Sequence, residues 1–223
     1  MRVLFFLFLL LAACGRPLTP AEKSFAIQLH GTSIDTTRIR AIHGAPLGAV
    51  TFERPKRPRV ACRERILPEP ETEIITVSPA AMVLHNKVFF ARDWYLADYL
   101  QGYPEKLDLL SAMLFAHEMT HVWQWQNREV TGYSPLKAAR EHNYSEDPYL
   151  YDIETKTRFL DYAYEQQASI VEEYVCCAAL DPEGSRTKRL EALLRGTFPV
   201  DRMSLPKSIL IPWKDAELGG ICS

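Results

Sequence analysis

Residues 104–124, PEKLDLLSAMLFAHEMTHVWQ, contain the pattern that decides how this chain folds. Apolar residues such as Leu110 and Leu114 recur there at intervals of three and four, and this period predicts a helix. His117 and His121 continue the same row. Because residues four apart project from one face of a helix, the two imidazoles can converge on one metal ion.

Glu118 completes an H-E-x-x-H motif with the two histidines. It is rotated by about 100° from His117, so its carboxylate can reach a metal-bound water without coordinating the metal. The arrangement suits hydrolysis, because zinc lowers the pKa of its water while a glutamate takes the proton. We therefore predict one zinc ion with Glu118 as general base. The alternative, two core histidines, would need other partners for the ring nitrogens.

A catalytic zinc site also needs a third protein ligand and an open position. The metzincin pattern requires Gly at position 124 and His at position 127, where this chain has Gln124 and Asn127, so that class is excluded. A carboxylate from a later helix is the remaining solution.

The apolar period from Thr157 to Ala179 predicts such a helix. We assign Glu165 as the third ligand because the small Ala168 lets two helices approach closely, with Glu172 or Glu173 as alternatives. A solvated acidic face is the other interpretation. Asp161 and Glu172 lie on the same predicted face, so either could orient a ligand histidine.

The N-terminus predicts a bacterial lipoprotein. Arg2 precedes an apolar run that is too short to span a bilayer and ends in Leu11-Ala12-Ala13-Cys14. Residues 1–13 are then a signal peptide and residues 14–18 a tether lipidated at Cys14. We expect a lipid anchor in the cell envelope, in the outer membrane and facing the periplasm.

Such a compartment is oxidising, which bears on four cysteines. Because adjacent cysteines rarely bridge each other, we expect Cys62 and Cys222 each to pair with Cys176 or Cys177. Buried free thiols are the alternative.

The formal net charge of −2 gives no basic field for nucleic acid. Basic residues nevertheless crowd residues 53–70, called the arginine segment below, where prolines interrupt them. We predict an exposed loop without a helix there, since proline breaks helices. A patch that binds a partner or anionic lipid is the alternative.

The remaining signals predict one α+β domain over residues 19–223. Thr19 to Glu22 reads as a capping box that opens a helix to Leu29. Strands are expected at 38–42 and 74–77, a hairpin at 82–90, a polar connection after Gly132 and a short helix at 185–194.

Several segments of the chain are characteristic together: GTSID at 31–35, RIR at 38–40, VFF at 88–90, HEMTHVWQ at 117–124 and YEQQASIV at 164–171. They resemble a bacterial family of largely uncharacterised zincin-like domains, related to Vgr proteins and found near toxin and type VI secretion loci. The resemblance implies a gluzincin-type site of His117, His121 and Glu165, with Glu118 as base. It also implies a small sheet and hairpin packed on the motif helix, and a partner from a secretion system or toxin locus.

We therefore predict a zinc metallopeptidase at the cell envelope that cleaves a peptide or protein. Zincins commonly bind peptides along an edge strand, and the hairpin is placed for strand addition. Candidates for stabilising the oxyanion are His142, Tyr133, Tyr149 and Tyr151. A non-catalytic lipoprotein held together by zinc, and a hydrolase of a non-peptide envelope substrate, are the alternatives.

Overall fold

The described part of the chain has mixed α+β structure, as predicted. The computed structural model describes residues 15–45, 47, 51–144, 147–200 and 203–223, so the predicted signal peptide and Cys14 lie outside the described residues. Every helix within these residues is too short or too polar to cross a membrane.

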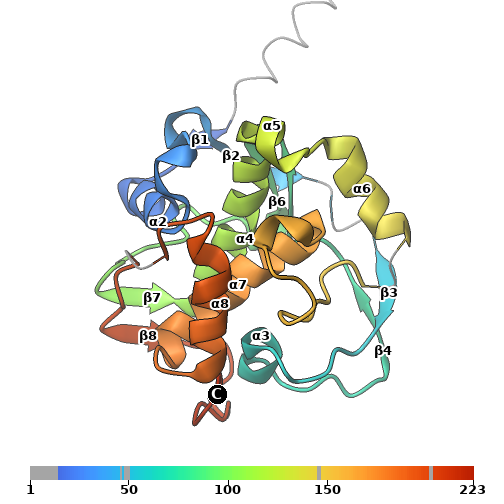
Figure 1. Ribbon diagram of the computed structural model, residues 1–223, viewed down its shortest axis with the longest axis vertical. Coiled ribbons are helices and arrows are strands. Elements are labelled where there is room, and N and C mark those ends of the chain that lie inside the picture. Colours follow the sequence, from blue (N-terminus) through green and yellow to red (C-terminus); the bar gives the residue numbers. More distant parts are fainter. Residues whose placement is uncertain (1–14, 46, 48–50, 145–146, 201–202) are drawn as a thin grey trace, which may run out of the picture.

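Two long helices form the centre of the structure (Figure 1). They are α4 (Leu109–Gln126), which carries the H-E-x-x-H motif, and α7 (Tyr164–Leu180), and they pack against each other. The buried apolar side chains form a contiguous core cluster around this pair. Helix α8 (Ser185–Arg195) covers α7, close to its predicted bounds.

Helix α7 begins seven residues later than the sequence period suggested. Residues 159–161 form a short 3-10 helix, η5 (Phe159–Asp161), and Ala163 is extended with ψ 159°. The side chain of Gln166 folds back so that its oxygen accepts the N–H of Ala163, at 3.2 Å. This contact stops the helix from extending toward residue 157.

The main sheet has the strand order β1-β2-β6-β5. Its strands are β1 (Arg16–Pro17), β2 (Arg40–Ala45), β6 (Lys87–Ala91) and β5 (Ala81–Leu84). The predicted hairpin is confirmed as the antiparallel pair β5–β6, which leaves β5 at the edge of the sheet. The strand expected at 38–42 begins later, because residues 36–38 form a 3-10 helix, η2 (Thr36–Arg38), capped by Asp35.

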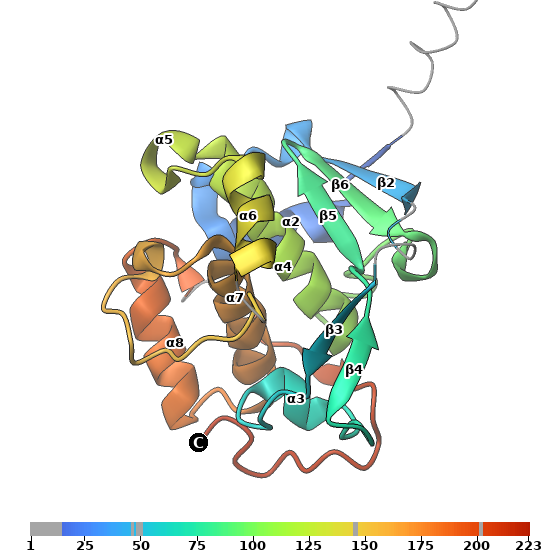
Figure 2. The ribbon, with the colours of Figure 1, turned by 90° about the vertical axis from the view of Figure 1, so that its right-hand side faces the viewer.

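The prediction for the arginine segment is wrong. Strand β3 (Phe52–Pro55) pairs with β4 (Ile74–Val77), and helix α3 (Cys62–Ile66) follows, with the first and last residues of α3 fully buried. Prolines at 58 and 68 exclude a helix only at and just before their own positions, which leaves room for one short turn between them. Figure 2 shows the β3–β4 ribbon extending from the end of β5 toward α3.

The other elements frame this centre. The capping box of α2 (Pro20–His30) is confirmed, since Thr19 and Glu22 exchange hydrogen bonds. Helix α6 (Pro135–Tyr144) replaces the polar connection expected after Gly132. The rest are η1 (Gly31–Ser33), η4 (Arg92–Trp94), β7 (Lys106–Asp108), β8 (Ser208–Leu210) and α5 (Arg128–Thr131).

Candidate metal centre

Three predicted ligands meet between α4 and α7. The Nε2 atoms of His117 and His121 lie 3.2 Å apart, and Glu165 Oε2 lies 3.3 Å and 3.2 Å from them respectively. All three side chains are buried, and together they form a group that could hold a metal ion.

The size of this triangle fits a small divalent metal. Zinc binds nitrogen and oxygen at about 2.0–2.1 Å, and tetrahedral angles then separate neighbouring ligand atoms by about 3.3 Å. The observed separations of 3.2–3.3 Å agree with this value. The chemistry of the donor set agrees too, since imidazole and carboxylate are both zinc ligands.

The outer nitrogens of the two histidines fix which inner nitrogen carries a lone pair. His117 Nδ1 donates to Glu172 Oε2 at 3.0 Å, and His121 Nδ1 donates to Gln124 Oε1 at 2.9 Å. The amide of Gln124 is itself oriented, because its nitrogen donates to two other oxygens. When neutral, each histidine therefore turns the lone pair of Nε2 toward the centre of the triangle.

Electrostatics favour a positive charge at this point. Burial alone lowers the pKa of His117, but the hydrogen bonds to Glu165 and Glu172 outweigh it and raise this pKa to about 10. Burial alone raises the pKa of Glu172, but Arg63 and His117 outweigh it and lower this pKa to about 2. Without a metal the site thus holds a proton, which a divalent cation would replace.

Glu118 lies beside the triangle and is not part of it. It is buried, and burial raises the pKa of its carboxyl group. Among the described residues, its Oε2 is the one buried side-chain polar atom without a hydrogen-bond partner. An unsatisfied buried carboxylate oxygen next to a metal-binding group is placed to accept a proton from a water or a substrate.

Of the two residues predicted to orient a ligand histidine, only Glu172 contacts one. Asp161 does not lie on α7 as expected, and its carboxylate instead pairs with Arg158 on the surface, at 2.6 Å. The prediction for Asp161 is wrong because the helix begins after it. Glu173, an alternative third ligand, bonds to Tyr151 and Arg186 and points away from the triangle.

Two residues that the sequence did not single out position the ligands. The carboxylate of Glu141, on α6, accepts the backbone N–H groups of Tyr164 and Glu165 at 3.0 Å and 3.1 Å. It thereby caps the turn of α7 that carries the third ligand. Gln124, noted only for excluding a metzincin, holds His121.

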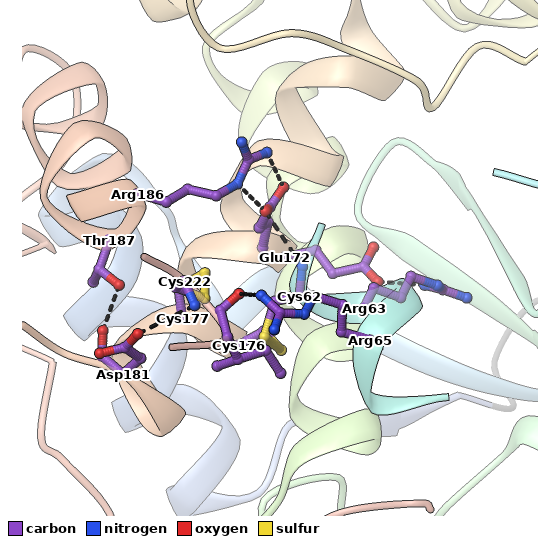
Figure 3. The surroundings of a disulfide bond; sticks show 12 residues. Cys62, Arg63, Arg65, Glu172, Cys176, Cys177, Asp181, Arg186, Thr187 and Cys222 are labelled. Atoms are coloured by element: carbon purple, nitrogen blue, oxygen red, sulfur yellow. Dashed lines mark hydrogen bonds and ion pairs between the residues drawn. A yellow bond between two sulfur atoms is a disulfide. The ribbon is translucent and has the colours of Figure 1, made fainter. Parts of the chain in front are cut away.

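Arg63, from the arginine segment, forms an ion pair with Glu172. The chain has two disulfides among the described residues, Cys62–Cys176 and Cys177–Cys222, and they are one of the two pairings expected. Figure 3 shows Cys62 and Arg63 beside Glu172 and Cys176 on α7. The first disulfide thus ties the segment to the helix at the point where the ion pair forms.

A cavity of about 400 Å³ opens beside His117 and Glu118. Its walls come from the arginine segment, from the approach to β5 and from the loop before α7. The arginine segment is therefore a wall of the candidate site and not a distant loop.

The four oxyanion candidates differ in position. Tyr149 lines the cavity with its ring centroid 5.8 Å from that of His117. Tyr151 also lines it but donates its hydroxyl to Glu173, while Tyr133 packs against Tyr164. The side chain of His142 lies outside the part of the chain that the structure describes.

Comparisons with known proteins give one informative likeness. No protein-family model matches the chain, and no curated protein matches it. Among solved structures, it is similar to the effector domain of Pseudomonas aeruginosa VgrG2b. The identity is 27% and the TM-score 0.53, over 82% of this chain and 85% of that domain. This likeness supports the Vgr-related part of the resemblance seen in the sequence.

Proposed function

We propose that this chain is a zinc-dependent metallopeptidase with a zincin-like fold of the gluzincin type. The proposal is carried by one observation, the triangle of His117, His121 and Glu165 with the unpartnered Oε2 of Glu118 beside it. The likeness to an effector domain is consistent with an enzyme of this class.

Each residue has a definite task in the proposed reaction. Zinc, when bound, would supply a Lewis acid that lowers the pKa of a water and polarises a carbonyl. Glu118 takes the proton of the attacking water and passes it to the leaving amine. Glu172 and Gln124 keep the two imidazoles in the tautomer and orientation that binding requires. Of the three oxyanion candidates whose side chains the structure describes, Tyr149 has its ring against that of His117 in the cavity.

Strand β5 offers a place for the peptide. In its antiparallel register with β6, Met82 and Leu84 point their backbone groups toward β6, so Ala81 and Val83 point theirs outward. Among the described residues no strand pairs with this outer edge. Ala81 also lines the cavity, so an extended peptide added to β5 would reach the metal centre.

The proposed place of action is the bacterial cell envelope. It follows from the lipoprotein signal that ends at Cys14, and two disulfides fit an oxidising compartment. A protein encoded with secretion-system or toxin genes is the proposed partner, on the strength of the Vgr-related likeness.

The test uses residues 15–223 and compares wild type with Glu118→Gln. We expect both proteins to hold about one zinc, and only wild type to cleave a diverse peptide library. His121→Ala and Glu165→Ala should lose the zinc. Equal cleavage by Glu118→Gln would refute its role as base.

The alternatives give different results. A zinc-held structural lipoprotein would retain zinc in both proteins and cleave no peptide. A non-peptide hydrolase would leave the peptide library intact yet degrade isolated envelope material in a Glu118-dependent way.

A further inference from the structure

The arginines that line the cavity beside the candidate metal centre differ in how closely carboxylates contact them. The cavity is lined by Arg54, Arg57, Arg63 and Arg186, and by Glu64, Glu118, Glu172 and Glu173. Three of the arginines have close carboxylate partners: Arg57 binds Asp147, Arg63 binds Glu172 and Arg186 binds Glu173. Arg54 is the fourth.

Among the described residues, Arg54 has no carboxylate that it does not share with another arginine. The carboxylate nearest to its guanidinium is that of Asp147, whose Oδ2 lies 3.9 Å from Nη1. Arg57 already holds Asp147 through two hydrogen bonds of 2.5 Å and 2.8 Å, and the N–H of Tyr149 binds it at 3.1 Å. One Nη1 contact of Arg54 goes to the carbonyl of Pro55, which leaves other N–H groups of the guanidinium available.

The surroundings make this charge unfavourable in the free protein. The Arg54 side chain is only 14% exposed. Burial and then the positive charge of Arg57 lower its pKa, in contrast to Arg57 and Arg63, whose pKa values are raised. A largely buried cation whose carboxylate partner is distant and is shared with a second arginine gains from an anion that enters with the substrate.

The strand places Arg54 toward the cavity. Phe52 and Arg54 both line it, and Glu53, which lies between them, is exposed on the other face of β3. A volume of about 400 Å³ is that of a few residues of extended peptide, which advances about 3.3 Å per residue. A group bound at Arg54 would therefore lie within a few residues of the cleaved bond.

We propose that Arg54 is a specificity-determining residue, whose guanidinium binds a carboxylate of the substrate through bidentate hydrogen bonds. The substrate class is then a peptide with an acidic side chain, or its own C-terminal carboxylate, close to the scissile bond. The inference rests on the proposed peptidase function and adds its substrate preference. Arginine suits the role because its planar N–H groups match a carboxylate.

The experiment compares four zinc-loaded proteins on matched peptides. The proteins are wild type, Arg54→Gln, Arg54→Glu and the control Arg38→Gln, which changes an exposed arginine outside the cavity. Each is given peptides that carry Asp, Asn or Lys at one position. A second series compares a free C-terminus with a C-terminal amide. We expect wild type and the control to prefer one carboxylate form by about 10- to 100-fold in kcat/KM, as for a charged hydrogen bond.

The two Arg54 variants test whether this residue determines the preference. Arg54→Gln should abolish the preference without loss of zinc, and Arg54→Glu should favour Lys at the same position. If the variants change the preference in the Asp and Asn series, the bound carboxylate is that of an acidic side chain. If they change it in the C-terminal series, the bound carboxylate is that of the peptide's C-terminus. Cleavage with an unchanged Asp-to-Asn ratio in Arg54→Gln would overturn the inference and leave the peptidase proposal standing.

A binding measurement separates the two proposals if no peptide is cleaved. Fluorescence anisotropy of the same labelled peptides on zinc-loaded Glu118→Gln should show the carboxylate preference, and adding Arg54→Gln should remove it. No preference, or no binding, would overturn the role of Arg54. Thermal unfolding of each variant, with Arg54→Lys as a charge-retaining form, checks that folding is intact.

Discussion

The Cys62–Cys176 disulfide should contribute both to the stability of the protein and to metal binding at the candidate centre. The bond closes a loop with a sequence separation of 114, for which loop-closure entropy predicts about 4.8 kcal/mol of stabilisation. The Cys177–Cys222 bond, with a separation of 45, gives about 4 kcal/mol by the same relation. The two loops follow each other along the chain without overlap, so their effects should roughly add.

Their sum is about as large as the whole stability of an ordinary domain. We therefore expect the fully reduced protein to be at or near unfolding. In urea, the paired variants Cys62→Ser/Cys176→Ser and Cys177→Ser/Cys222→Ser should each lose about 4–5 kcal/mol of unfolding free energy.

The two disulfides should differ in their effect on zinc affinity. Removing the first bond frees Arg63 from its place beside Glu172, so zinc affinity should fall about tenfold, the effect expected for a disturbed partner of a ligand histidine. Removing the second bond is the matched control, with a similar energy and no contact with that pair. The assay is competition with a chelator at a urea concentration where all variants remain folded.

Two results would refute this reasoning. A loss below about 1 kcal/mol in either paired variant would show that loop closure does not describe these bonds. Equal zinc affinities in the two paired variants would show that the first disulfide does not support Arg63.

Three further predictions concern single residues. Glu172→Gln should weaken zinc binding by about 10- to 100-fold in the chelator assay, and an unchanged affinity would contradict its contact with His117. Val83→Pro removes an outward N–H of β5, so kcat/KM for peptides should fall by about 2- to 10-fold with zinc retained; equal cleavage would argue against strand addition. Burial lowers the pKa of His30 from 6.5 to about 4, so between these pH values the unfolded chain is protonated at His30 and the folded protein is not. Stability should then fall by up to about 3 kcal/mol as pH drops from 6.5 to 4, and a His30→Gln variant with the same pH dependence would refute this cause.

The sequence predicted those parts of the site that depend on local periodicity. His117, Glu118 and His121 lie on one helix, where spacing alone determines which side chains share a face. Glu165 was assigned from a second helix period, and the structure brings it to the two histidines. The bounds of that helix could not be predicted, because its N-terminus is capped by Glu141 from a helix that the sequence did not reveal.

The misjudged arginine segment shows what a single sequence cannot supply. Its prolines and charges favour an exposed loop, yet α3 is held against α7 by a disulfide and an ion pair that join residues more than a hundred positions apart. Such contacts depend on the tertiary fold. Two cysteine pairings were anticipated and one of them is observed, but its consequence, that Arg63 reaches the site, was not anticipated.

The candidate metal centre and the arginine segment are linked electrostatically. Helix α7 buries two consecutive carboxylates with different partners. Glu172 contacts His117, and Glu173 contacts Arg186. A buried carboxylate without a partner costs several kcal/mol, and Glu172 has the Nδ1–H of His117 as one partner. Arg63 provides the ion pair that compensates its charge. A segment that read as a solvated loop is in this way the source of the cation that keeps the histidine's partner ionised.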